Sequence, residues 1–281
     1  MSLPAEIRVM ILETIACRKH PGWAAFASVC REWQVILERF NFHKLKLGIP
    51  HLDSFKHVAA EREELIHHIL LDIELPRYSA QCCTKGHPKR RSPPVKTGPI
   101  VSDAIWRLFS ILSTWEPGDN LALEINVYSR SDCEHWFKKI YVSSDHVEND
   151  EDAALEDCNI GLPYQDLQHG WAHGRQVCAP PRSAVKRLFR PIDLKFRETL
   201  PRVRAVTSLI IRRQLRRCIN PYGLTQLLSS LHGLNHMSYE PWAPDRISDR
   251  EIHDYCMYQH RQQLHKLRIP TSFENTPVIL R

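Results

Sequence analysis

Three side chains in one central segment have the chemistry to bind a metal ion. Cys82, Cys83 and His87 carry soft donor atoms, but adjacent cysteines with a single histidine lack the paired spacing of a structural zinc site. His169 and His173 lie four residues apart, yet the glycine that follows each of them argues against a helix that would align the two rings. We therefore expect no metal site and no cofactor, and we place both histidines in a loop.

The local motifs of the common enzyme classes are absent from the sequence. No Gly-rich phosphate loop, His-Glu-x-x-His zinc motif, Gly-x-Ser-x-Gly nucleophile turn or Cys-x-x-Cys pair occurs. With 10 glycines in 281 residues, the chain also has little material for loops that cradle a cofactor. We predict that the protein is not an enzyme and has no catalytic residues, although a site assembled from distant residues would leave no local trace.

The basic residues offer a different chemistry, the neutralisation of phosphates. The chain has 38 lysines and arginines and 32 aspartates and glutamates, which gives a net charge of +6. This small excess does not indicate a particular class of partner by itself. Charge is nonetheless segregated: range 182–217 holds twelve basic and two acidic residues, and range 145–157 holds seven acidic residues in thirteen. The arginines could bind nucleic acid, but they could equally pair with the acidic run or stay solvated. A nucleic-acid-binding or nuclear scaffold protein using 182–217 is therefore the alternative function, and nucleic acid is not the partner we expect.

The sequence carries no sign of a membrane or secretory destination. Its longest apolar stretches are interrupted and stay short of the roughly 20 residues that a membrane helix requires. The first residues lack a basic flank followed by an apolar core, and nine cysteines without regular spacing favour reduced thiols. We expect a soluble protein of the cytoplasm or nucleus with no membrane partner. The group Lys89-Arg90-Arg91 could be a nuclear import signal or a plain linker.

The first 47 residues are predicted to form a compact helical unit. Pro4 and Glu6 suit the first turn of a helix. Its apolar face recurs at spacings of three and four residues and comprises Ile7, Met10, Ile11 and Ile15. A break at 20–22 and a short helical turn at 23–27 lead to a second apolar stripe, which comprises Val29, Trp33, Ile36, Leu37 and Phe40. A cluster of three helices with only about 40 residues in total cannot bury both apolar stripes internally. We therefore expect exposed apolar surface to remain, which a partner protein could cover.

Beyond residue 47 the apolar pattern changes to a mixture of strands and helices. Alternating apolar residues predict strands at 69–75 and 121–127. Helical spacing predicts helices within 51–64 and over 101–115. The order of strand, loop, helix and strand indicates an α/β fold.

The C-terminal third repeats this order. An apolar triplet of the form Leu-x-x-Leu-x-Leu recurs at intervals of 28 and 30 residues, beginning at Val206, Leu234 and Leu264. Helices are predicted in the gaps, at 222–231 and 249–263. This spacing is typical of leucine-rich repeats, in which each unit buries its face against its neighbours. We therefore predict an irregular repeat domain over 48–281, with loops at 79–99 and 143–180.

Two blocks near the N-terminus resemble the F-box motif. The first is Leu3-Pro4-Ala5-Glu6-Ile7 followed by Met10-Ile11-Leu12, and the second is Phe26-Ala27-Ser28-Val29-Cys30-Arg31-Glu32-Trp33. The segments Arg39-Phe40-Asn41-Phe42 and Ser113-Thr114-Trp115-Glu116-Pro117 further resemble fungal F-box proteins with a degenerate leucine-rich-repeat region. The chain as a whole is therefore similar to a small three-helix F-box followed by an irregular leucine-rich-repeat-like array of strands and helices.

This resemblance implies a role in protein ubiquitination. The N-terminal helices would bind the S-phase-kinase-associated adaptor of a cullin-RING ubiquitin ligase, and the repeat domain would recruit a protein substrate whose identity and contact residues are unknown. By motif position the implied adaptor contacts are Leu3, Pro4, Ile7, Ile11, Val29, Cys30 and Trp33. Among these residues, Leu3 and Pro4 are the ones that we expect most to contact the adaptor directly. Ile11, Val29 and Trp33 could instead pack the three helices against one another.

Overall fold

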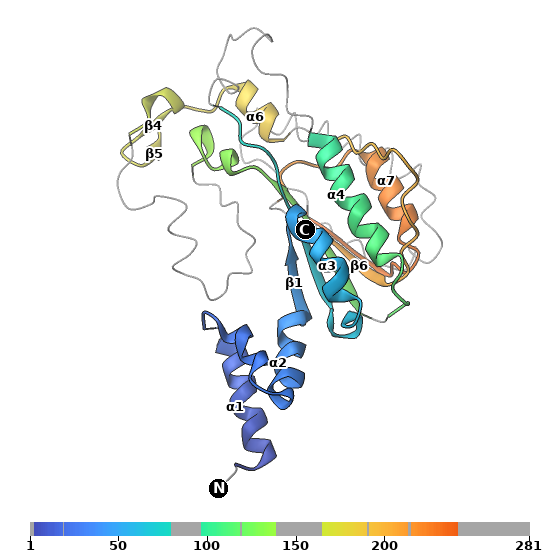
Figure 1. The fold of residues 1–281 in the computed structure, drawn as a ribbon. Helices are drawn as coiled ribbons and strands as arrows, with labels where there is room; N and C mark the ends of the chain where they lie inside the picture. The colour runs from blue at the N-terminus through green and yellow to red at the C-terminus, as the bar shows by residue number, and fades with distance from the viewer. Residues whose placement is uncertain are drawn as a thin grey trace.

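The computed structural model is an α/β protein with a parallel five-stranded sheet, helices along one face of the sheet and a helical lobe at the N-terminus (Figure 1). The α/β class predicted from the sequence is thus confirmed. The structure describes residues 3–18, 20–79, 97–118, 120–138, 165–189, 191–212 and 215–240.

The N-terminal lobe consists of α1 (Ala5–Arg18), the 3-10 helix η1 (Trp23–Ser28) and α2 (Arg31–His43). Glu6 lies in the first turn of α1 and Arg18 in the last, where each charge interacts favourably with the helix dipole. Gly22 precedes η1 with φ +81°, a left-handed conformation that glycine adopts without steric cost. A small core joins the two long helices and is made of Leu12, Ala16 and Leu37.

Helix α2 passes directly into the first strand of the sheet, β1 (Lys44–Leu47). The sequence pattern places residues 44–47 in the helical unit, whereas the structure moves the boundary between helices and sheet to His43. The alternation explains the difference, because Leu47 is buried and Leu45 half-buried while both lysines are exposed. That period of two is typical of a strand, but four residues are too few to stand out in the sequence.

The junction between α2 and the sheet is braced from the side. Arg62 forms an ion pair with Glu38 of α2 at 3.2 Å, and its guanidinium lies 5.2 Å from the ring centroid of Phe42. The amide of His67 donates to the carbonyl of His43 at 3.1 Å, and the two imidazole rings lie 4.8 Å apart. The end of α2 is therefore held against the segment that leads into the second strand.

The five strands run parallel in the order β1-β2-β3-β6-β7, so each new strand is added beside the previous one. The strands after β1 are β2 (His68–Glu74), β3 (Leu121–Tyr128), β6 (Val206–Ile211) and β7 (His236–Tyr239). The predicted strands at 69–75 and 121–127 and the triplet at Val206 are confirmed, and the triplet at Leu234 forms a strand in its second half. The triplet at Leu264 lies outside the described residues.

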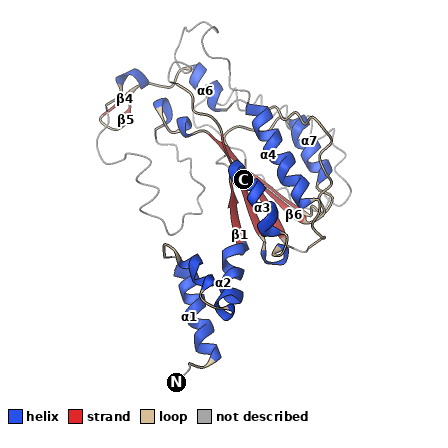
Figure 2. Cartoon of the chain, viewed as in Figure 1, coloured by secondary structure: helices blue, strands red, loops and turns tan. Residues whose placement is uncertain are grey.

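Three helices cover one face of this sheet (Figure 2). They are α3 (Leu52–Ala59), α4 (Thr97–Leu112) and α7 (Pro221–Ser230), with the 3-10 helices η2 (Ile49–His51) and η3 (Glu63–Leu65) flanking α3. Crossovers between neighbouring parallel strands are right-handed, so successive connections return on the same side of the sheet. Helical spacing predicts α3 and α4, and the gap between two repeat triplets predicts α7. The predicted helix at 249–263 lies outside the described residues.

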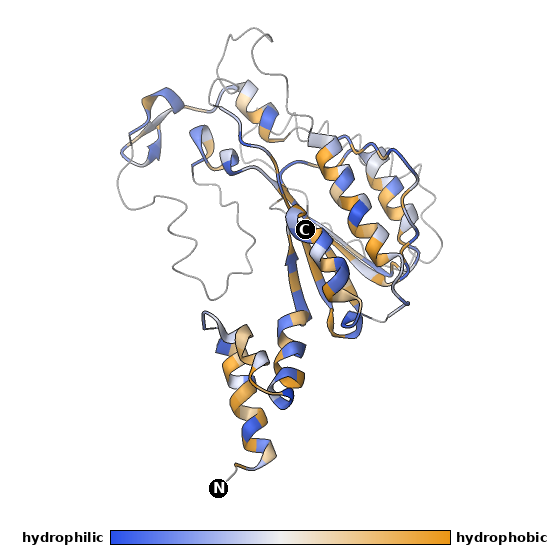
Figure 3. Ribbon diagram, in the orientation of Figure 1, coloured by the Kyte–Doolittle hydropathy of each residue, from blue (hydrophilic) through white to orange (hydrophobic). Residues whose placement is uncertain are grey.

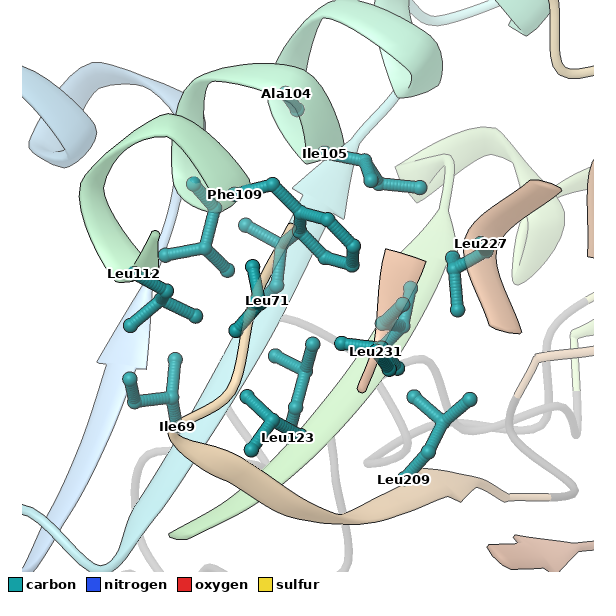
Figure 4. Close-up of a cluster of buried hydrophobic side chains, with 14 of the residues drawn as sticks. Ile69, Leu71, Ala104, Ile105, Phe109, Leu112, Leu123, Leu209, Leu227 and Leu231 are labelled. Carbon is teal, nitrogen blue, oxygen red and sulfur yellow. The ribbon is translucent and has the colours of Figure 1, made fainter. Parts of the chain in front are cut away.

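The main core lies between these helices and the sheet (Figure 4). Phe109 of α4 is fully buried among the leucine and isoleucine side chains of the sheet and of α7. The labelled neighbours are Ile69, Leu71, Ala104, Ile105, Leu112, Leu123, Leu209, Leu227 and Leu231. Burial of each large apolar side chain stabilises the fold by about 1.5 to 3 kcal/mol. Residues far apart in sequence are thus joined in one core.

Both predicted loops contain regular structure. Helix α4 begins at Thr97, inside the predicted loop 79–99, because the turn-forming pair Gly98 and Pro99 fits the first turn of a helix. Within the predicted loop 143–180, the structure forms the 3-10 helix η7 and a two-stranded hairpin, and the helix α6 follows it. Their bounds are η7 (Leu167–His169), β4 (Trp171–Ala172), β5 (Arg175–Gln176) and α6 (Arg182–Leu188). The rest of these loops, residues 80–96 and 139–164, lies outside the described residues.

Candidate functional site

Helix α1 has two apolar sides, and only one of them is packed. Leu12 and Ala16 are buried against α2. The opposite side of the helix carries large apolar residues at helical spacing that remain exposed, and Leu3, just ahead of the helix, is exposed as well. We call these residues the α1 stripe: Leu3, Ile7, Met10 and Ile11. Met10 is the most exposed of the four, at 60%. Apolar residues recur around α1 in the hydropathy colouring (Figure 3).

A second exposed apolar group lies where η1 leads into α2. Val29 is 61% exposed, and Phe26 and Cys30 beside it are also exposed. Cys30 is the N-cap residue of α2 in an extended conformation, which turns the chain into the helix. Trp33 is half-buried, packs against the small core of the lobe, and meets the ring of Phe26 edge-on with centroids 6.2 Å apart. We call Phe26, Val29 and Cys30 the connector group.

The structure separates the seven predicted adaptor contacts into two kinds. Six of them are exposed, namely Leu3, Pro4, Ile7, Ile11, Val29 and Cys30. Trp33 is half-buried and packs within the lobe, as the packing interpretation expects, whereas Ile11 and Val29 do not follow that interpretation. Met10 and Phe26 are exposed beside these residues as well, although the motif positions do not include them. Helical spacing already places Met10 beside Ile7.

Exposed apolar side chains at this density carry a cost in water. A large aliphatic side chain gains about 1.5 to 3 kcal/mol when a partner buries it fully. Monomeric proteins rarely leave large apolar patches uncovered unless the patch binds something. The α1 stripe is therefore chemically suited to bind an apolar groove or helix of another protein, and it has no groups suited to catalysis.

The sheet face opposite the helices has a different chemistry. The carboxylates of Asp72 and Glu124 are buried there on the neighbouring strands β2 and β3. Asp72 pairs with Lys46 at 2.9 Å and accepts a hydrogen bond from Asn126 at 2.7 Å. Glu124 pairs with Arg212 at 2.9 Å and contacts Nε2 of His68 at 2.9 Å.

These pairings limit what the polar face can do. Each buried carboxylate already has two partners, so neither is placed to act as a free general base. Burial, together with the nearby carboxylates of Asp72 and Glu74, raises the pKa of Tyr128 to about 12. The phenol therefore stays protonated at neutral pH.

The arginine-rich range 182–217 is partly used inside the protein. Arg217 is buried and binds Asp132 with both terminal nitrogens, and Arg212 pairs with Glu124. The guanidinium of Arg187 stacks over the ring of Tyr78, 4.4 Å from its centroid. Contacts of this kind reduce the positive charge that is available for phosphates. The acidic run at 145–157, one of the partners considered for these arginines, lies outside the described residues, as does the group Lys89-Arg90-Arg91.

The histidines considered as metal ligands lie in different settings. His169 is buried, with Nδ1 2.8 Å from Asp166, whereas His173 is exposed with a left-handed φ of 48°. Burial opposes ionisation of Asp166, but hydrogen bonds from Lys138 and His169 lower its pKa overall. Within the described ranges, no three side chains are grouped so that they could hold a metal ion. Cys82, Cys83 and His87 fall among the residues that are not described.

No helix in the described part of the chain is both long enough and apolar enough to cross a membrane. Comparison with protein-family models gives no match, and no curated protein matches the chain significantly in sequence. The likeness to F-box proteins therefore rests on the two motif blocks themselves and on the residues that they leave exposed.

Proposed function

We propose that the protein is a substrate-recruiting F-box subunit of a cullin-RING ubiquitin ligase. In this proposal the α1 stripe and the connector group bind the S-phase-kinase-associated adaptor. The observation that carries the proposal is that one side of α1 remains exposed and apolar at the positions where the first motif block resembles an F-box. A helix that is apolar on both sides needs a second surface to bury the exposed one.

The arrangement of the sheet supports the second half of the proposal. Strands β1, β2 and β3 are neighbours in sequence and in space, and helices α3 and α4 fill the two connections on one face. One strand and one helix per unit, added in order, is the organisation of leucine-rich repeats. We infer that this repeat-like domain selects a protein substrate.

A subunit of this kind performs no bond chemistry itself. It holds a target close to a ubiquitin-charged partner and so raises the effective concentration of the target there. This role fits the absence of local catalytic motifs from the sequence. The alternative, nucleic-acid binding through 182–217, has weaker support because Arg187, Arg212 and Arg217 are held in internal contacts.

The proposal is tested by measuring adaptor affinity with the full chain. Replacing Leu3 and Pro4 together by alanine should weaken binding of the purified adaptor by about tenfold or more, because buried apolar contacts would be lost. The circular dichroism spectrum should not change. The control is Val58→Ala, which removes an exposed apolar side chain from α3 instead. Wild-type protein that fails to bind the adaptor, or a double variant that binds as tightly as wild type, would falsify the proposal.

A further inference from the structure

One side chain of α1 links three separate segments of the N-terminal lobe. Nε of Arg8 lies 2.9 Å from Oε1 of Glu32, which belongs to the first turn of α2. Nη1 of the same guanidinium donates a hydrogen bond to the backbone carbonyl of Leu3, ahead of α1. The backbone amide of Arg8 also donates to the carbonyl of Pro4 at 3.2 Å. A single residue therefore connects the start of the first motif block to the second block.

We infer that Arg8 is a positioning residue that holds Leu3 and Pro4 in the orientation in which they bind a partner. This inference rests on the proposed function, because it assigns a role in the same adaptor interface. Residues ahead of a helix lose order readily when nothing restrains them. A restraint that exists before binding removes part of the ordering cost from the binding step, so it raises affinity without adding a contact to the partner.

The geometry separates this role from ordinary stabilisation of the fold. The side chains of Arg8 and Glu32 are 33% and 41% exposed, and ion pairs at such exposure contribute little to folding stability. Leu3 is exposed and takes no part in the small core of Leu12, Ala16 and Leu37. Loss of the Arg8 contacts should therefore appear in adaptor affinity while the unfolding temperature stays the same.

Four variants of the full chain divide the role of Arg8 into its parts. Arg8→Met removes the guanidinium contacts to Glu32 and to the Leu3 carbonyl and keeps much of the aliphatic stem. Arg8→Lys keeps the charge, but an ammonium lacks the forked donors that reach two acceptors in different directions. The exchange Arg8→Glu with Glu32→Arg restores an ion pair without a donor for the Leu3 carbonyl. Arg18→Met is the matched control, since it makes the same substitution at an exposed position in the last turn of α1.

The readout is the affinity for purified adaptor by isothermal titration calorimetry, with hydrogen exchange of the Ala5–Met10 amides in the unbound chain. Arg8→Met should weaken affinity about three- to tenfold and speed exchange in the first turn. Arg8→Lys should lie between Arg8→Met and wild type, and the charge exchange should stay near Arg8→Met. Arg18→Met should behave as wild type in both measurements.

Three results would overturn the inference. Arg8→Met with wild-type affinity would show that the restraint is irrelevant to binding. Full recovery in the charge exchange would show that the ion pair acts alone and that the Leu3 carbonyl contact has no role. Wild-type protein that does not bind the adaptor at all would overturn the proposed function and this role with it, whereas the first two results leave the proposed function intact.

Discussion

Helices α1 and α4 are similar in length and both are rich in apolar residues, yet they differ in how many of their residues are buried. Nine of the 16 residues of α4 are buried, whereas only two of the 14 residues of α1 are buried. The apolar residues of α4 are satisfied within the chain. Those of the α1 stripe are exposed to solvent. Hydrophobic content alone therefore does not determine whether a helix is buried in the core.

The largest expected effect is a difference in folding stability between substitutions in α4 and substitutions in α1. Phe109→Ala should lower the free energy of unfolding by about 3 to 5 kcal/mol, because it opens a cavity in the main core. Met10→Ala in the α1 stripe should change it by less than about 0.5 kcal/mol, since the side chain is exposed. Urea unfolding followed by circular dichroism measures both. Equal losses for the two variants would contradict the contrast between the helices.

A buried ion pair close to the sheet is expected to contribute strongly to folding stability. Asp132, at the end of the 3-10 helix η5 (Arg130–Asp132), is buried with Arg217 and also accepts a hydrogen bond from the Tyr78 hydroxyl at 3.0 Å. Asp132→Asn leaves a buried guanidinium without its counter-charge and should cost about 3 kcal/mol of folding stability.

The matched control for Asp132 is Asp53, whose carboxylate pairs with Arg107 at 2.7 Å although its side chain is 86% exposed. Asp53→Asn should change stability by less than about 1 kcal/mol, because water screens exposed ion pairs. Chemical denaturation of both variants at neutral pH makes the comparison. If Asp132→Asn proves as mild as Asp53→Asn, the buried pair is not needed to hold the segment after β6 against η5.

The smallest effect is a pH dependence on the polar face of the sheet. The pKa of Tyr128 is raised to about 12 from a reference of 10.0, so the native state favours the protonated phenol. The stability from this group is present below pH 10, where the unfolded state is also protonated, and is lost as the pH rises from 10 to 12. Tyr128→Phe should therefore make the alkaline loss of stability less steep.

The control for Tyr128 is Tyr222→Phe, since Tyr222 is 65% exposed on α7. The free energy of unfolding measured from pH 9 to pH 11 should keep its wild-type slope in this variant. An identical slope in all three proteins would mean that Tyr128 does not contribute to the alkaline transition.

Much of the fold was predictable because its signals are local. The strands at 69–75 and 121–127 have alternating apolar residues over seven or more positions, and α4 and α7 have helical spacing. The strand β1 was missed because it is four residues long and follows a helix without a turn. The pairing of Asp132 with Arg217 joins residues 85 apart in sequence, and no local pattern indicates such a contact.

The candidate site was predictable in part for the same reason. Helical spacing places Ile7 and Ile11 on one side of α1, and motif position adds Leu3 ahead of the helix; the structure leaves all three exposed. Whether Trp33 or Val29 faces the core depends on how α2 packs against α1, which a one-dimensional pattern does not contain. The role inferred for Arg8 needed the three-dimensional distance between its guanidinium and Glu32.

The direct passage of α2 into β1 has a mechanical consequence. With no spacer between them, the angle between the lobe and the sheet is set by the backbone torsions of His43 and Lys44, and the Arg62 brace opposes any swing. A protein that binds α1 would therefore also fix the orientation of the sheet relative to itself. A molecule bound to the sheet would then lie at a fixed distance and in a fixed direction from the protein bound to α1.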